Sequence, residues 1–225
     1  MTKSNNVLII APHPDDEVIG CGGVIKKMSD AGESVFVLVL TRGAPTMYSD
    51  EKIENVRHEA RSAHKILGVK ESVFLDFYAP ELDITPQAKI SGEISNVIRK
   101  YDIDTLYIPH RGDIHHDHQA VFKASLVAAR PTGNYSVVNI YAYETLSETE
   151  WAAPFADDAF IPTRFVNVED TFSAKVEAMK CFKSQLRDFP NSRSIEAMAA
   201  LASCRGSTVG FLKAEAFMHI RSIEK

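Results

Sequence analysis

Short apolar runs alternate with segments of helical spacing along the first two thirds of this chain, and no other feature limits its fold as strongly. The runs are rich in Val, Ile and Leu, as is typical of strands covered on both faces, and they lie at residues 7–11, 34–41, 73–75 and 105–109. The intervening segments carry apolar residues three or four positions apart, over residues 20–31, 50–67, about 90–98 and about 118–129. Such alternation predicts an α/β fold with a largely parallel sheet, helices on both faces and right-handed crossovers.

The last third of the chain is less regular. We expect strands at residues 137–143 and 165–168, and helices at residues 174–186 and 195–202. No Ser/Gly-rich or charged linker separates this part from the rest, and 225 residues suffice for one well-filled core. We therefore predict a single domain over residues 1–225, with a core of about 1–145 and a C-terminal elaboration of about 146–225.

Two clusters of His and Asp follow two of the predicted strands. Ala11-Pro12-His13-Pro14-Asp15-Asp16-Glu17 follows the first run, and Asp113-Ile114-His115-His116-Asp117-His118 follows the run at 105–109. In open α/β sheets the ligand crevice lies outside the carboxyl ends of the strands, so the two clusters are expected to meet. Imidazole nitrogen and carboxylate oxygen both bind zinc, and a catalytic site uses about three protein ligands. The pattern predicts one metal site with His13, Asp16 and a histidine that the spacing does not choose.

The neighbouring carboxylates suggest catalysis at that site. Adjacent side chains diverge, so we expect one of Asp15 and Asp16 to bind the metal and the other to face its water as a general base. A histidine that is not a ligand would stabilise an oxyanion or protonate a leaving amine, and Asp117 would orient an imidazole. In the alternative interpretation, His13 and Asp15 are ordinary turn and cap residues. The presence of the second His/Asp cluster favours the metal-site interpretation.

Composition narrows the class of partner. A formal net charge of -5 gives no general attraction to nucleic acid or anionic membranes, and no segment reaches the ~18 apolar residues of a membrane span. The N-terminus lacks the pattern of a signal peptide, and three distant cysteines predict separate, mostly buried thiols rather than disulfides. We expect a cytoplasmic protein that acts on a small molecule. An exposed apolar surface in the last third would support a homo-oligomer.

The residues of the two clusters resemble a known family. His13-Pro14-Asp15-Asp16-Glu17, followed by Gly20-Cys21-Gly22-Gly23, is similar to the opening motif of the LmbE-like, or PIG-L, metal-dependent N-deacetylases, and His115-His116-Asp117-His118 matches their His-x-Asp-His motif. The glycines lack the Gly-x-Gly-x-x-Gly spacing of a dinucleotide loop and predict close helix packing instead. Weaker matches extend the resemblance over nearly the whole chain: Arg57-His58-Glu59, Leu67-Gly68, Tyr143-Glu144-Thr145, Lys175, Ser184-Gln185, Arg205-Gly206 and Glu215-Ala216-Phe217.

The resemblance implies a Rossmann-like domain with one zinc ion that removes an N-acetyl group from an amino sugar or amino-sugar conjugate. By position it implies that His13, Asp16 and His118 bind the metal and that Asp15 is the general base. It gives His115 the task of polarising the amide carbonyl or stabilising the oxyanion, Asp117 that of tuning a neighbouring histidine, and Arg57 that of binding substrate. Some members have a tyrosine where this chain has Asp113, which leaves His115 as the better oxyanion group.

Three alternatives stay open at this stage. The same site would serve a zinc hydrolase of another amide bond. A protein that binds metal and carbohydrate without catalysis would keep the pocket but have no need of Asp15. Fe(II), Mn(II) or Co(II) would also suit a His/Asp site of this type.

Overall fold

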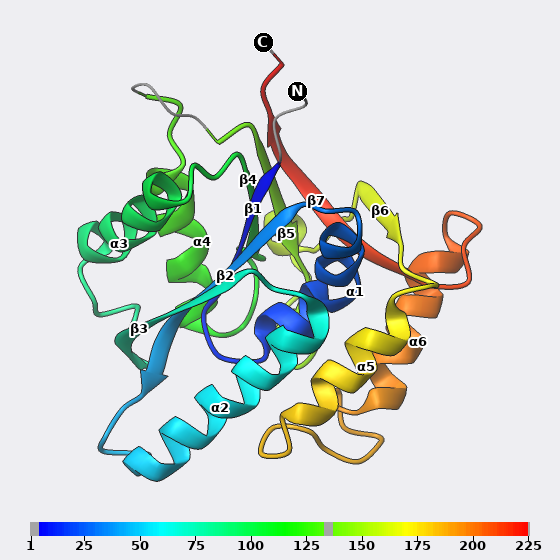
Figure 1. Ribbon diagram of the computed structural model, residues 1–225, viewed down its shortest axis with the longest axis horizontal. Coiled ribbons are helices and arrows are strands. Elements are labelled where there is room, and N and C mark those ends of the chain that lie inside the picture. Colours follow the sequence, from blue (N-terminus) through cyan, green and yellow to red (C-terminus); the bar gives the residue numbers. More distant parts are fainter. Residues whose placement is uncertain (1–4, 133–136, 225) are drawn as a thin grey trace.

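A mixed seven-stranded sheet forms the centre of the computed structural model, which describes residues 5–132 and 137–224 (Figure 1). The strands are β1 Asn6–Ala11, β2 Ser34–Gly43, β3 Glu71–Ala79, β4 Thr105–Pro109, β5 Asn139–Tyr143, β6 Arg164–Asn167 and β7 Ala214–Ser222. Their order is β3-β2-β1-β4-β5-β7-β6, with β1 to β5 parallel and β7 antiparallel to both neighbours. The predicted α/β fold with a largely parallel sheet is confirmed.

Helices cover both faces of the sheet. They are α1 Asp16–Asp30, α2 Asp50–Leu67, α3 Gln87–Lys100, α4 His116–Ala128, α5 Phe172–Cys181 and α6 Ile195–Ser207, with a 3-10 turn, η1, at Ala156–Asp158. Figure 1 shows α3 and α4 on one side of the sheet and α1, α2, α5 and α6 on the other. No helix in the described part of the chain is both long and apolar enough to cross a bilayer.

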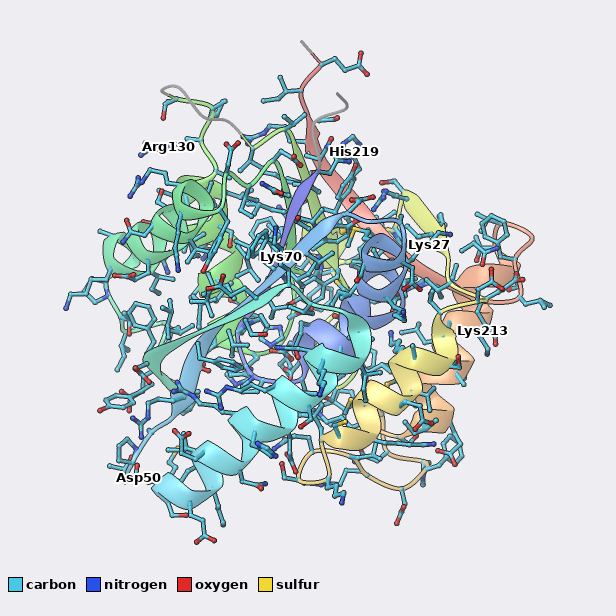
Figure 2. All side chains as sticks on the ribbon, viewed as in Figure 1. Lys27, Asp50, Lys70, Arg130, Lys213 and His219 are labelled. Carbon is cyan, nitrogen blue, oxygen red and sulfur yellow. The ribbon has the colours of Figure 1, made fainter. Side chains whose placement is uncertain are left out.

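The sheet has a buried core on each face, because successive side chains of a strand point to opposite sides. Val7 and Ile9 of β1 pack on the side of α1 and α2, whereas Leu8 and Ile10 pack on the side of α3 and α4. A central strand buried on both faces explains the continuous apolar run after residue 6. Side chains fill the space between sheet and helices, and charged residues such as Lys27 and Asp50 lie at the periphery (Figure 2).

Several predicted boundaries are wrong. Helix α1 begins at Asp16 rather than residue 20, so the carboxylates of the first motif lie in its first turn. Helix α5 ends at Cys181 rather than residue 186, because buried Phe182 leaves the helical conformation. Strand β7 was not predicted, because Glu215 interrupts its apolar pattern at a buried position. The predicted division near residue 145 remains a prediction, although β6 and β7 extend the same sheet.

The expectation about the cysteines holds only in part. Cys21 is buried and all three thiols are free, but Cys181 is half-buried and Cys204 is exposed on α6. The expectation of no signal peptide depends partly on residues 1–4, which lie outside the described residues.

The glycines of α1 allow close packing, as predicted. A Cβ at Gly20 would lie 2.3 Å from the Tyr143 ring, one at Gly22 would lie 2.8 Å from Cγ of Lys175, and one at Gly23 would lie 2.8 Å from Cβ of Val168. Only residues without a side chain permit these contacts. Helix α1 is thereby seated against β5 and α5.

A buried ion pair holds α1 from the same side. Nζ of Lys175 donates to the carbonyl of Ile19 at 2.7 Å and to Oε1 of Glu215 at 2.6 Å. The carboxylate of Glu215 accepts the backbone N–H groups of Gly23 at 2.9 Å and Val24 at 2.7 Å. These bonds connect β7 and α5 to the helix that begins at the His/Asp loop.

Candidate metal centre and active site

The loop after β1 turns sharply before α1. Asp15 is the N-cap of α1 and has φ 109°, in the left-handed region that favours glycine, which costs about 1–3 kcal/mol for another residue. Its backbone N–H donates to Oε2 of Glu17 at 3.1 Å, and Oε1 of Glu17 lies 2.9 Å from Nε2 of His64. Oδ2 of Asp16 accepts the backbone N–H of His13 at 2.9 Å. The carboxylates of the motif therefore hold the strained turn in place.

The second cluster begins α4. His115 is the N-cap, and its Nδ1 accepts the backbone N–H of Asp117 at 3.1 Å. His118 and Asp117 lie in the first turn of α4, where both are fully buried. Because β1 and β4 are neighbouring parallel strands, the N-termini of α1 and α4 meet at one edge of the sheet. The two clusters lie together there.

Three side chains from the two clusters converge. Ligand atoms of His13, Asp16 and His118 all lie within 4.8 Å of one another. Oδ2 of Asp16 is 3.3 Å from Nδ1 of His13 and 3.2 Å from Nε2 of His118. His118 is thus the histidine of the second cluster that the structure brings to Asp16.

Unpartnered polar atoms show that this group fits a cation. Among the described residues, Oδ1 of Asp16 and Nε2 of His118 are buried without a hydrogen-bond partner. Each such atom costs about 1–3 kcal/mol unless something binds it. Two imidazoles and a carboxylate form a donor set that zinc accepts in catalytic sites.

Buried carboxylates fix both imidazoles from behind. Nδ1 of His118 is 2.8 Å from Oδ2 of Asp113, and Oδ1 of Asp113 accepts the hydroxyl of Thr149 at 2.6 Å. Nε2 of His13 is 3.0 Å from Oδ2 of Asp117. Such carboxylates hold the tautomer and orientation of a metal-binding histidine. Asp117 therefore contacts His13 through its side chain and His115 through its backbone.

A second group of potential ligands is less suitable. Atoms of His13, His115 and Asp117 also lie within 4.8 Å of one another. However, one oxygen of Asp117 is engaged by His13, and the other accepts the backbone N–H of Leu82 at 2.9 Å. Nδ1 of His115 is occupied as well. These groups already have partners, so the set around Asp16 is the better candidate.

The electrostatic environment of His13, Asp16 and His118 favours positive charge at these side chains. Burial alone would lower the pKa of His13, but Asp117 and Asp16 raise this pKa to about 9. Burial is likewise outweighed at His118, where Asp16 and Asp113 raise the pKa well above its ordinary value. Burial would raise the pKa of Asp16, but His118 and His13 hold it well below the usual range. A bound cation would meet the same demand for positive charge.

Asp15 has an environment suited to a base. Its side chain is buried, its Oδ2 accepts from Nη1 of Arg193 at 2.5 Å, and its Oδ1 has no hydrogen-bond partner among the described residues. Burial raises the pKa of Asp15 to about 8, against the opposing effect of Arg193. A carboxylate with a raised pKa accepts protons more readily than an exposed one.

His115 is placed as a hydrogen-bond donor. Its ring centroid lies 4.5 Å from that of His13. Because Nδ1 accepts the N–H of Asp117, the hydrogen-bond pattern assigns the ring proton to Nε2. Burial lowers the pKa of His115 to about 4, so the neutral form is favoured.

Arg57 lies apart from this group. In the described part of the chain its Nη2 donates to the carbonyl of Leu75 at 2.6 Å and to Oδ1 of Asp76 at 2.8 Å. These contacts tie α2 to β3, and none of them reaches the His/Asp cluster. Its predicted role in substrate binding remains a prediction.

Arg193 is a polar partner of the site that the sequence did not indicate. It lies in the loop between α5 and α6, 178 residues after Asp15. Ser194 supplies a recognisable N-cap for α6, since its hydroxyl accepts the N–H of Ala197 at 3.1 Å. Nothing in the local pattern around residue 193 distinguishes this arginine from a surface residue.

The surface cavities of the protein coincide only partly with the candidate metal site. A cavity of about 820 Å³ lies along α3 and α4 against Ser91, Asn96 and Ala128, and none of the predicted ligands lines it. A smaller cavity of about 250 Å³ is lined by Thr149 and by Arg205, which pairs with Glu144. The chemistry of the side chains, rather than cavity size, locates the candidate site.

Known proteins match this chain in sequence. The profile of the family described as PIG-L, GlcNAc-PI de-N-acetylase, matches residues 8–129, which include both clusters. The uncharacterized deacetylase YaiS of Escherichia coli K12 is 31% identical over 81% of this chain and 92% of its own length. The diacetylchitobiose deacetylase of Thermococcus kodakarensis is 32% identical over 80% of this chain and 69% of its own length.

A solved structure shares the fold. The conserved protein TT1542 from Thermus thermophilus superposes with a TM-score of 0.79 at 24% identity, covering 97% of this chain and 96% of that one. The superposition extends over the last third, beyond the residues that the family profile matches.

Proposed function

Because this chain belongs to the PIG-L family of GlcNAc-PI de-N-acetylases, we propose that it removes the N-acetyl group of an amino sugar or amino-sugar conjugate. Acetate and a free amine are the products. The observation that carries the proposal is the convergence of His13, Asp16 and His118 beside a carboxylate, Asp15, that is not among the proposed ligands. A diacetylchitobiose deacetylase among the relatives supports the sugar class.

His13, Asp16 and His118 would hold one metal ion. We propose zinc, because two imidazoles and a carboxylate leave room for a water in its coordination, although Fe(II), Mn(II) and Co(II) suit the same donors. When bound, such an ion lowers the pKa of its water from ~15.7 towards ~7 and polarises a carbonyl. Asp113 and Asp117 keep the two imidazoles in position.

Asp15 moves the proton. Its unpartnered Oδ1 accepts a proton from the attacking water, so that the oxygen of that water can bond to the acetamide carbon. When the C–N bond breaks, the protonated Asp15 returns this proton to the departing nitrogen. The same carboxyl group serves both steps because the oxygen from the water and the departing nitrogen are bonded to the same tetrahedral carbon.

His115 stabilises the negative charge on the former carbonyl oxygen. Its ring proton lies on Nε2, because Nδ1 accepts the N–H of Asp117, and no partner for Nε2 is found in the described part of the chain, so Nε2–H can donate. With Nδ1 in use as an acceptor, His115 carries no second proton. This arrangement favours the oxyanion role over that of a general acid.

Arg57 is the proposed substrate-binding residue. It neutralises Asp76, whose side chain is 67% exposed. The exposed carboxylate of Asp76, held by Arg57, would accept hydrogen bonds from hydroxyl groups of a sugar.

We also propose a cellular location, a class of partner and an oligomeric state for the enzyme. Three free cysteines support a cytoplasmic enzyme, because disulfides are rare in that compartment. The net charge of -5 supports a small N-acetylated sugar as the substrate and no nucleic-acid partner. Phe211 and Leu212, in the last third, are exposed and support a homo-oligomer.

Acetate release from a panel of N-acetylated amino sugars and their conjugates tests the function. The panel is assayed with metal-free protein, zinc-reloaded protein, zinc-loaded Asp15→Asn and, as a control, Asp30→Asn on the exposed end of α1. We expect zinc-dependent release that Asp15→Asn abolishes and Asp30→Asn leaves intact. Release from other acyl amides alone would move the function to another amide bond. No release at a metal-filled site would indicate a binding protein.

A further inference from the structure

We propose that Arg193 is a positioning residue that fixes the general base Asp15, an inference that rests on the proposed function. Nη1 of Arg193 contacts Oδ2 of Asp15 at 2.5 Å, and Nε donates to the hydroxyl of Ser147 at 2.8 Å. Its Nη2 lies 3.8 Å from Oε1 of Glu148. One guanidinium therefore connects the loops after β1, after β5 and after α5.

The backbone around Arg193 is itself well anchored. Its N–H donates to Oδ1 of Asn191 at 2.9 Å, and its carbonyl accepts the N–H of Arg187 at 3.1 Å. The next residue, Ser194, is fully buried and caps α6. The guanidinium thus reaches Asp15 from a closed turn at the start of a helix, as a positioning group requires.

Both main partners of Arg193 have a strained backbone. Asp15 has φ 109° and Ser147 has φ 73°, and they are two of the three non-glycine residues with positive φ in the described part of the chain. The N–H of Ser147 donates to both carboxylate oxygens of Glu150, at 2.7 and 2.9 Å. Strain of this kind persists where surrounding bonds hold a side chain in a required place.

The arrangement selects one oxygen of Asp15. Arg193 engages Oδ2, which leaves buried Oδ1 as the oxygen available for a proton. The planar fork of arginine holds Asp15 and Ser147 at once, whereas a lysine ammonium is a single point charge. No hydrogen bond or ion pair in the described chain joins Arg193 to His13, Asp16 or His118. Positioning of the base and metal binding are therefore separable.

Kinetics of the zinc-loaded enzyme test the proposal. We expect Arg193→Ala to lower kcat by about 10- to 100-fold, the range for groups that orient functional side chains, with KM and zinc content unchanged. Arg193→Lys should recover part of the loss. The matched control is Arg187→Ala on the same loop, because the guanidinium of Arg187 donates only to the carbonyls of Ser184 and Leu186 in the described structure, and alanine keeps the backbone N–H that donates to the carbonyl of Arg193. It should retain wild-type kcat.

Two further measurements distinguish positioning from general support of the fold. Added methylguanidinium should restore kcat of Arg193→Ala in a saturable way, while sodium chloride of equal ionic strength should not. In an Asp15→Asn background Arg193→Ala should cause no further loss, because residues acting as a unit are not additive. An equal loss in both backgrounds, or full activity of Arg193→Ala, would overturn the proposal while the deacetylase function stood.

If the wild-type enzyme releases no acetate, the proposed function fails. The contact between Arg193 and Asp15 can then still be tested by thermal unfolding. Arg193→Ala leaves the buried carboxylate of Asp15 without its cation, so it should lower Tm in the wild-type background and much less in Asp15→Asn. Equal shifts in the two backgrounds would show that Arg193 does not act on Asp15.

Discussion

Alanine at Gly20 should destabilise the protein although it is the better helix former. Gly20 lies inside α1, where Ala is favoured over Gly by about 1 kcal/mol. The added Cβ would lie 2.3 Å from Cδ2 of Tyr143, a fully buried ring whose hydroxyl donates to the carbonyl of Ile10 at 2.9 Å. Overpacking costs about 1–3 kcal/mol and loss of the hydrogen bond about 0.5–1.5 kcal/mol. With the midpoints of these two costs and the gain in helix propensity, Gly20→Ala should lower the free energy of unfolding by about 2 kcal/mol, or lower Tm by roughly 4–8 °C for a chain of this size.

Gly92 provides the matched control. It lies inside α3 and is exposed, and a Cβ there meets no atom within 4 Å. Gly92→Ala should therefore raise the stability by about 0.5–1 kcal/mol. Thermal unfolding followed by circular dichroism gives both shifts. If Gly20→Ala unfolds at or above the wild-type Tm, the reasoning that α1 is held by contact with Tyr143 is refuted.

Three other substitutions follow from the site. Asp15→Asn should retain zinc, measured by metal analysis, and lower kcat by about 10²- to 10⁴-fold, the range for a general base; near-normal turnover would remove Asp15 from that role. Asp113→Asn should weaken zinc binding by about 10- to 100-fold in a competition titration, because it loosens His118; an unchanged affinity would show that His118 needs no support. Lys175→Met leaves Glu215 buried without its cation and should cost about 3–5 kcal/mol in urea unfolding; a loss below about 1 kcal/mol would argue against a buried ion pair.

Local patterns were sufficient for strands β1 to β6 and for the meeting of the two clusters. Apolar runs identify strands because both faces of β1 and β2 are buried, and parallel neighbours place their following loops together. The start of α1 was misplaced because Asp16 and Glu17 are polar yet buried, which a periodicity of apolar residues does not detect. Strand β7 was missed for the same reason, since Glu215 faces Lys175 inside the protein.

Local sequence patterns do not predict contacts between loops that are distant along the chain. Arg193 meets Asp15 only because the loop after α5 folds over the start of α1, and neither residue carries a local signal of that contact. The partner of Asp117 was also undetermined, because the spacing of the second cluster is compatible with several histidines. The structure places the side chain of Asp117 against His13, in the other cluster.

The pairing of buried carboxylates supports the proposed cation site at Asp16. Asp15 is paired with Arg193, Asp113 with His118 and Asp117 with His13, so each of these carboxylates has a different basic side chain as its partner. Asp16 lies between two imidazoles, and both are already oriented by other carboxylates. Protons on both rings would satisfy these carboxylates, but a divalent ion would do so with one particle and would also engage Oδ1 of Asp16 and Nε2 of His118, which have no hydrogen-bond partner in the described part of the chain. The surrounding charges thus favour a cation between the two loops, and Oδ1 of the neighbouring Asp15 is the oxygen of that carboxylate that Arg193 leaves free.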